Sequence, residues 1–262
     1  MNHLLHSQEI GPVDGPGLVL FHGFFSDSES WQPLAVGLAS HFRVLLLDLP
    51  GHGRSAAALL DLEDWQALNG SLLARIEAMQ CAGRPWVAGY SMGARTALQL
   101  AQFAPSALGG LVLISGHPGF QDPKDAQARR IEDELLAQRL EYQELEEVVQ
   151  EWEKKPIFAG QGERAQQRQR YLRLQQHGPS LAVALRRFGS GTCLRPSAAV
   201  PMTGPVHIIT GDRNKVDQER AESLCDLFPE SELTILSDCG HNPLVEAPVQ
   251  LSFLIRQAWQ QA

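Results

Sequence analysis

Short apolar runs recur along the chain and alternate with longer segments whose apolar residues follow helical spacing. The runs are continuous rather than alternating, which is typical of strands that are buried on both faces of a parallel sheet. They lie at residues 18–21, 44–47, 86–88, 111–114, 206–209 and 233–236. The helical segments lie at residues 29–40, 61–80, 92–103, 216–228 and 245–260. This pattern predicts a doubly wound α/β fold, with a mostly parallel sheet flanked by helices.

The alternation of strand and helix stops between residues 121 and 199, where the chain is rich in Gln, Glu, Arg and Ala. Pro156, Pro179 and Pro196 divide this stretch into several predicted helices. A helical insertion between two strands of a parallel sheet lies at one sheet end and covers what the strand ends present. We therefore predict a helical lid at 121–199, inserted into a core made of residues 1–120 and 200–262.

Composition and charge exclude several classes of partner. The chain has 262 residues, with 22 Lys and Arg against 30 Asp and Glu and a formal net charge of −8. An acidic balance argues against broad binding to nucleic acid or to an anionic membrane, because both require an excess of Lys and Arg. The four cysteines have no metal-like spacing, and no apolar run is long enough to cross a bilayer. We expect a cytoplasmic monomer or small homo-oligomer that needs no metal and no cofactor.

The most informative motif is Gly-Tyr-Ser-Met-Gly-Ala-Arg at residues 89–95, which follows a predicted strand and opens a predicted helix. This context is the one that a G-x-S-x-G nucleophile elbow requires, because a tight strand-to-helix turn needs small neighbours and exposes its serine. Gly89 and Gly93 occupy the small positions, and Ser91 is the candidate catalytic serine. Arg95 follows Ser91 by four residues, so both side chains lie on one helix face.

A second motif, His-Gly-Phe at residues 22–24, ends another predicted strand. In a fold with a nucleophile elbow this loop lies beside the serine. The backbone N–H groups of Phe24 and Met92 would then form an oxyanion hole. We interpret His22 as a residue that holds the loop by hydrogen bonds rather than as a catalytic base.

The histidine of the site is predicted to be His241, on the loop Cys-Gly-His-Asn that follows the last strand. The chain order nucleophile, acid, histidine leaves only this histidine late enough in the sequence. The acid is expected in a G-x-x-D pattern after the strand at 206–209, where the sequence has Asn214 instead. Either Asn214 orients the imidazole through its amide, or Asp212 or Asp217 substitutes; we favour Asn214.

Together, these motifs and the turn Asp-Leu-Pro-Gly-His-Gly-Arg-Ser at residues 48–55 make the chain resemble an α/β-hydrolase over nearly its full length. More narrowly it resembles the MenH family, the 2-succinyl-6-hydroxy-2,4-cyclohexadiene-1-carboxylate synthases of menaquinone biosynthesis. The narrower resemblance depends on Arg95, on Ser-Gly-His-Pro-Gly-Phe at 115–120, on Trp-Glu-Lys-Lys-Pro-Ile-Phe at 152–158 and on Leu-Arg at 172–173. The sequence departs from the family pattern at Ala94, where a glycine is usual, and at Asn214, where an aspartate is usual.

The resemblance implies a carbon–oxygen lyase rather than a hydrolase. Its substrate is a small polycarboxylate that carries an enolpyruvyl ether, and removal of a ring proton expels pyruvate. Ser91, deprotonated with help from His241, would act as a base rather than as a nucleophile. The resemblance also assigns substrate-binding residues to the pocket: Tyr90, Arg95, Arg129, Trp152 and Arg173. Arginine suits this task because its fork of N–H donors matches a carboxylate.

Two other functions remain open at this point. The same serine, histidine and oxyanion loop would serve an enzyme that hydrolyses an ester, a thioester or a carbon–carbon bond of a small carboxylate. A non-catalytic binder that has kept the fold and lost its activity is the second alternative, and Asn214 is the one residue that favours it.

Overall fold

A seven-stranded sheet runs through the computed structural model, which describes residues 5–60, 62–193 and 195–261. The strand order is β1-β3-β2-β4-β5-β6-β7, and every pairing is parallel except that of β1 with β3. The strands are β1 (Ser7–Ile10), β2 (Pro16–Phe21), β3 (Arg43–Leu47), β4 (Ala82–Tyr90), β5 (Gly110–Ile114), β6 (Val206–Gly211) and β7 (Glu232–Leu236). The predicted α/β class with a mostly parallel sheet is confirmed.

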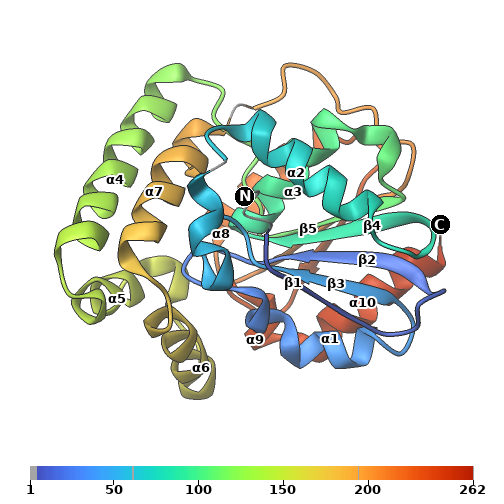
Figure 1. The fold of residues 1–262 in the computed structure, drawn as a ribbon, viewed down its shortest axis with the longest axis horizontal. Coiled ribbons are helices and arrows are strands. Elements are labelled where there is room, and N and C mark those ends of the chain that lie inside the picture. The colour runs from blue at the N-terminus through green and yellow to red at the C-terminus, as the bar shows by residue number, and fades with distance from the viewer. Residues whose placement is uncertain (1–4, 61, 194, 262) are drawn as a thin grey trace.

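Helices cover both faces of this sheet (Figure 1). On one face lie α2 (Trp65–Glu77), α3 (Met92–Phe103) and α8 (Lys215–Cys225), and on the other lie α1 (Gln32–Leu38), α9 (Pro243–Glu246) and α10 (Pro248–Gln260). Successive residues of β2 enter opposite cores: Val19 and Phe21 pack with α3, whereas Leu18 and Leu20 pack with α1. The continuous apolar runs in the sequence therefore reflect two cores that share each strand.

The sequence pattern misses β1, an edge strand in which Gln8 is exposed and the other three residues are half-buried. Its four residues include Ser7, Gln8 and Glu9, so no apolar run marks it. It pairs with β3 alone, and Glu9 accepts hydrogen bonds from Arg43 and Arg75. Short edge strands with charged side chains are a common way to protect a sheet edge.

The predicted helix boundaries differ from the structure mainly where caps and prolines intervene. Residues 92–103 form α3 as predicted. Helix α2 begins at Trp65 because the Asp64 side chain accepts a hydrogen bond from the Ala67 N–H; Asp61, where the prediction began, lies outside the described residues. The segment at 245–260 is two helices, since Pro248 begins α10 and the preceding residue has φ −138°. The segment at 29–40 begins with a 3-10 turn (Ser28–Trp31) before α1.

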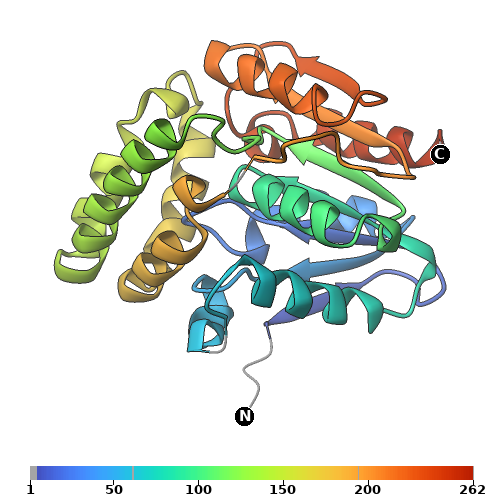
Figure 2. The same ribbon diagram turned by 90° about the horizontal axis from the view of Figure 1, so that it is seen from above.

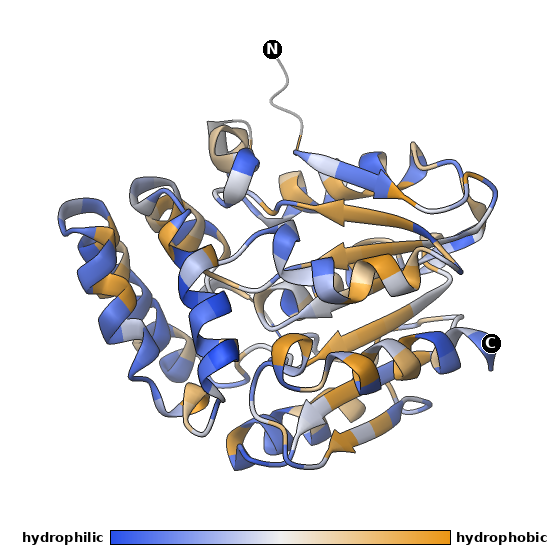
Figure 3. Ribbon diagram, turned by 90° about the horizontal axis from the view of Figure 1, so that it is seen from below, coloured by the Kyte–Doolittle hydropathy of each residue, from blue (hydrophilic) through white to orange (hydrophobic). Residues whose placement is uncertain are grey.

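Four helices lie between β5 and β6 and stand together beyond one end of the sheet, as Figure 2 shows from above. They are α4 (Pro123–Tyr142), α5 (Leu145–Glu153), α6 (Glu163–Leu174) and α7 (Gly178–Phe188). They share a small core with Phe25, to which Ala137, Val149 and Leu181 contribute. In Figure 3 the central strands are coloured as hydrophobic, whereas the insertion helices are mostly hydrophilic. Within the described ranges, every helix is too short or too polar to span a bilayer.

Candidate active site

Ser91 lies at the sharp turn between β4 and α3, with φ 53° and ψ −107°. Its backbone N–H donates to the Ile114 carbonyl at 2.9 Å, which ties the turn to the end of β5. The two flanking glycines are required by close backbone approaches. A Cβ at Gly89 would lie 2.2 Å from the Gly93 oxygen, and a Cβ at Gly93 would lie 2.2 Å from the Phe21 oxygen. This local geometry is that of a nucleophile elbow.

His241 lies between Ser91 and a buried carboxylate. Its Nε2 atom is 3.1 Å from Ser91 Oγ, and its Nδ1 atom is 2.7 Å from Asp217 Oδ2. The Asp217 side chain is 1% exposed. Burial alone would raise the pKa of Asp217, but its contacts with His241 and Arg220 hold that pKa below its ordinary value. The carboxylate is therefore ionised at neutral pH and able to fix the imidazole with Nδ1 protonated.

The expectation that Asn214 orients the histidine is wrong, because Asp217 occupies that position. Asn214 is the N-cap of α8: its Oδ1 accepts from the Val216 N–H at 3.1 Å, and its Nδ2 donates to Asp217 Oδ2 at 2.9 Å. Asp217 lies in the first turn of that helix, so the acid has moved from the strand end onto the helix. Asp212 instead accepts from the Cys239 N–H at 3.3 Å.

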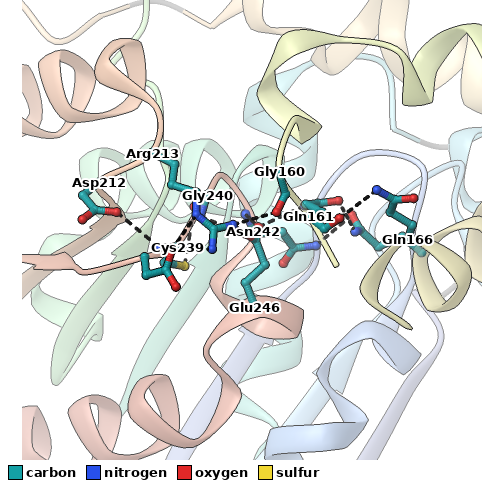
Figure 4. A network of polar contacts seen from close by, with 11 residues as sticks. Gly160, Gln161, Gln166, Asp212, Arg213, Cys239, Gly240, Asn242 and Glu246 are labelled. Atoms are coloured by element: carbon teal, nitrogen blue, oxygen red, sulfur yellow. Dashed lines mark hydrogen bonds and ion pairs between the residues drawn. The ribbon is translucent and has the colours of Figure 1, made fainter. Parts of the chain in front are cut away.

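The loop that carries His241 is fixed by the Glu246 carboxylate (Figure 4). Glu246 accepts from the backbone N–H groups on either side of the histidine, those of Gly240 at 2.9 Å and of Asn242 at 3.1 Å. It also accepts from Nε2 of Gln161, a residue of the helical insertion, at 3.0 Å. The position of the histidine is therefore linked to the insertion through one buried carboxylate.

The predicted oxyanion loop lies beside the elbow. Among the backbone hydrogen bonds of turns, loops and caps in the described part of the chain, none has Phe24 N–H or Met92 N–H as its donor. His22 holds this loop, as predicted: its Nε2 accepts from the Leu49 N–H at 2.9 Å. Burial lowers the pKa of His22, so its imidazole is neutral and able to accept that bond.

Ser91 and His241 line a cavity of about 230 Å³. The predicted binding residues Tyr90, Arg95, Arg129, Trp152 and Arg173 all line it. We call the side formed by the strand ends and by helices α3 and α8 the sheet wall; it consists of Phe24, Tyr90, Ser91, Arg95, Arg220 and His241. We call the opposite side the insertion wall; it consists of Arg129, Trp152, Lys155, Phe158 and Arg173.

The cations of the cavity differ in their partners. Arg129 Nε donates to Asp133 at 2.7 Å, and Arg173 donates to Glu153 at 2.9 Å and to Gln169 at 3.0 Å. The side chain of Arg95, by contrast, has no hydrogen-bond or ion-pair partner among the residues that the structure describes, and its buried Nε is unpaired. Burial lowers the pKa of Arg95 to about 10, so it remains a cation at neutral pH.

The cavity is also lined by two cations that were not predicted from the sequence, Lys155 and Arg220. Lys155 Nζ lies 3.8 Å from the centre of the Trp152 ring, and Arg220 donates to Asp217 Oδ1 at 3.3 Å. The signal for Arg220 was its spacing of three residues from Asp217 on one helix face. That signal has meaning only once Asp217 is known to face His241.

Comparisons with known proteins agree with this geometry. Residues 18–252 match the model of the alpha/beta hydrolase family. The chain is 31% identical to the 2-succinyl-6-hydroxy-2,4-cyclohexadiene-1-carboxylate synthase of Klebsiella pneumoniae strain 342, over 92% of this chain and 93% of that protein. It is 31% identical to the synthase of the same name from Salmonella typhimurium strain LT2, over 94% of each chain.

Among solved structures, MenH from S. aureus superimposes with a TM-score of 0.91 at 26% identity, covering 98% of both chains. The family resemblance read from the sequence is thereby confirmed. The chain belongs to the alpha/beta hydrolase family and, within it, to the 2-succinyl-6-hydroxy-2,4-cyclohexadiene-1-carboxylate synthases.

Proposed function

We propose that this chain converts 2-succinyl-5-enolpyruvyl-6-hydroxy-3-cyclohexene-1-carboxylate to 2-succinyl-6-hydroxy-2,4-cyclohexadiene-1-carboxylate and pyruvate, a step of menaquinone biosynthesis. One observation carries the proposal: the Ser91–His241 pair opens onto the same cavity as Arg95, Arg129 and Arg173. The activity named for its relatives requires a base beside several carboxylate-binding groups. This cavity supplies both.

In the proposed reaction Ser91 acts as the base. His241 Nε2, 3.1 Å from Ser91 Oγ, takes the hydroxyl proton, and the serine oxygen removes a ring proton of the substrate. The electron pair of the broken C–H bond forms a ring double bond between C2 and C3, and the electron pair of the former C3–C4 double bond moves to C4–C5. The bond between the ring and the enolpyruvyl oxygen breaks, and pyruvate leaves as its enolate, which then takes up a proton. No acyl-enzyme forms, and no water is consumed.

Negative charge develops on the succinyl carbonyl as the proton departs. The backbone N–H groups of Phe24 and Met92 would donate to that oxygen, since neither is a donor in the backbone hydrogen bonds of turns, loops and caps among the described residues. Asp217 keeps His241 Nδ1 protonated and stabilises the imidazolium that follows proton transfer. The chain's own residues thus account for both charges that appear during the reaction.

The cations of the cavity favour a polycarboxylate over a neutral ester. Arg95, Arg129, Lys155, Arg173 and Arg220 all line it, and a neutral substrate would leave Arg95 buried without a partner. We propose that these groups bind the carboxylates of the substrate, while Trp152 and Phe158 pack against its ring. The helical insertion, residues 121–199, would then act as a lid that excludes water from the reacting atoms.

The state of the cysteines indicates the compartment in which the enzyme acts. The four cysteines are free thiols, and Cys193 and Cys239 are buried. We therefore propose that the enzyme acts in the cytoplasm on a small-molecule polycarboxylate, with neither nucleic acid nor a membrane as partner.

Pyruvate release tests the proposal directly. Purified protein is incubated with the enolpyruvyl substrate, and pyruvate is measured with lactate dehydrogenase and NADH; hydrolysis of p-nitrophenyl acetate is measured in parallel. We expect rapid pyruvate release that falls by ~10³-fold or more in Ser91→Ala, because the base is lost. Rapid ester turnover without pyruvate release would replace the lyase with a hydrolase. Full activity in Ser91→Ala would remove the serine from the mechanism.

A further inference from the structure

The acid of the site receives hydrogen bonds at both of its oxygens. Asp217 Oδ2 contacts His241 Nδ1 at 2.7 Å and Asn214 Nδ2 at 2.9 Å. Asp217 Oδ1 contacts Arg220 at a longer 3.3 Å. The oxygen that faces the histidine is therefore held in place chiefly by the amide of Asn214.

We propose that Asn214 is a positioning residue that holds Asp217 Oδ2 against His241, a role that rests on the proposed function of the serine–histidine pair. At the position where the family usually has an aspartate, this chain thus has the amide of Asn214, which orients the carboxylate of Asp217 three residues later. Asn214 touches neither the histidine nor the cavity, so it acts through Asp217 alone.

The chemistry of this position explains why asparagine fits it. The side chain must accept from the Val216 N–H, as the N-cap of α8, and must donate to a carboxylate at the same time. An amide carries an acceptor oxygen and a donor nitrogen on one carbon, and the two neighbours dictate which atom points where. Aspartate caps a helix equally well but has no donor, and serine caps well but is one atom shorter.

An aspartate at residue 214 would place a second carboxylate about 3 Å from Asp217 Oδ2, as near as the amide nitrogen is now. Two carboxylates at that distance cannot both ionise at low cost, so the pKa of one of them rises. While the pair holds one proton, the protonated acid imitates the amide donor. Once that proton is lost, like charges repel and Asp217 turns away from the histidine.

The first test is Asn214→Ser, which keeps the cap of α8 and removes the amide donor. We expect kcat to fall ~10-fold or more with KM changed by less than ~2-fold, because a hydrogen bond to a charged group is lost while the cavity is unaltered. The downfield proton resonance of the His241–Asp217 hydrogen bond should broaden or move. Wild-type kcat together with an unchanged resonance would overturn the proposal.

The second test is the pH dependence of Asn214→Asp. We expect the ratio of its kcat to that of the wild type to fall as pH rises from ~5 to ~8, as the carboxylate pair loses its shared proton. A ratio that is independent of pH would overturn the role of the amide as donor. A variant more active than the wild type would show that the site lacks an acid, and would overturn the proposal as well.

The control is Lys215→Gln, a change in the same helical turn at a side chain that is 88% exposed. It should leave kcat, KM and the resonance unchanged, and thermal unfolding should show all three variants folded. A failure of the lyase assignment can be told apart from a failure of the proposed role of Asn214. If the wild type releases no pyruvate, the same series is measured on p-nitrophenyl acetate hydrolysis and on the resonance, both of which report the histidine–aspartate pair.

Discussion

The two walls of the cavity are built in different ways. On the sheet wall, Ser91 and His241 sit on turns that follow strands, while Arg95 and Arg220 sit on helices that pack on the sheet. Close backbone approaches fix the elbow at Ser91, because they leave no room for a side chain at Gly89 or Gly93. On the insertion wall the functional groups sit on helices with a small core, and Arg129 and Arg173 are held by acidic partners. The sheet wall is thus specified by backbone geometry, and the insertion wall by side-chain pairing.

The walls also differ in electrostatics. Arg95 on the sheet wall has no ion pair among the described residues, whereas Arg173 on the insertion wall is neutralised by Glu153. A desolvated and unpaired cation costs stability, and a substrate carboxylate repays that cost only when it binds. We therefore expect Arg95 to be the cation most specialised for the ligand, and Arg173 to serve the fold as well.

Among the variants that compare the walls, the largest effect is expected from Asp217→Asn, because the Asp217 carboxylate holds His241 of the sheet wall. An amide at this position removes the charge that stabilises the His241 imidazolium, and it allows the wrong tautomer. We expect kcat to fall by about 10³-fold with KM nearly unchanged, measured as pyruvate release. If Asp212→Asn caused a comparable loss and Asp217→Asn did not, the acid would have been placed on the wrong residue.

A smaller effect, and one that compares the walls directly, is expected from Arg95→Ala and Arg173→Ala. Arg95→Ala should lower kcat/KM by ~30-fold or more, equivalent to about 2 kcal/mol, without lowering the free energy of unfolding. Arg173→Ala should lower kcat/KM less and should reduce the unfolding free energy by ~1–2 kcal/mol, because its bonds to Glu153 and Gln169 are lost.

Steady-state kinetics and urea unfolding measure the two quantities on the same preparations. Arg95→Lys is the matched control, since it keeps the charge but not the fork of donors, and it should fall between wild type and Arg95→Ala. Equal destabilisation by both alanine variants would contradict the distinction between an unpaired and a paired arginine.

The smallest effect is expected from removing a surface ion pair between two helices of the insertion. Arg186 on α7 donates to Glu134 at 2.8 and 3.0 Å and to Glu141 at 2.9 Å, both on α4. These bonds raise the pKa of Arg186, which is about one-third exposed. We expect Arg186→Ala to lower the unfolding free energy by about 0.5–1 kcal/mol, since solvent screens much of the attraction. Lys154→Ala, from the exposed pair with Glu151, should change it less; the reverse order would contradict this reading.

The sequence predicted most of the sheet wall because its constraints are local. The glycines around Ser91, the apolar strand before it and the helix after it are contiguous in the chain. The strand β1 was missed because three of its four residues are polar and no apolar run marks it. Helix α10 was joined to α9 because the break at Pro248 depends on a turn that helical periodicity does not reveal.

The sequence did not single out Asp217, Lys155 and Arg220 as site residues, for a different reason. Asp217 is one of several acids after β6, and only the packing of α8 against the His241 loop selects it. Lys155 and Arg220 belong to different helical regions that meet only across the cavity. Arg129, Trp152 and Arg173 could be selected through family resemblance, because no local pattern distinguishes them from other charged or aromatic residues of the insertion.

Helix α3 carries both Ser91 at its N-cap and Arg95 one turn later. Four residues of α-helix advance by about 6 Å, and the helix is rigid because its apolar face is buried against the sheet. The helix therefore fixes the distance between the backbone positions of Ser91 and Arg95. We therefore expect the site to favour molecules whose carboxylate and acidic C–H stand about one helical turn apart over shorter anions of equal charge. Both residues belong to the sheet wall, so this selection by length would not require the insertion wall.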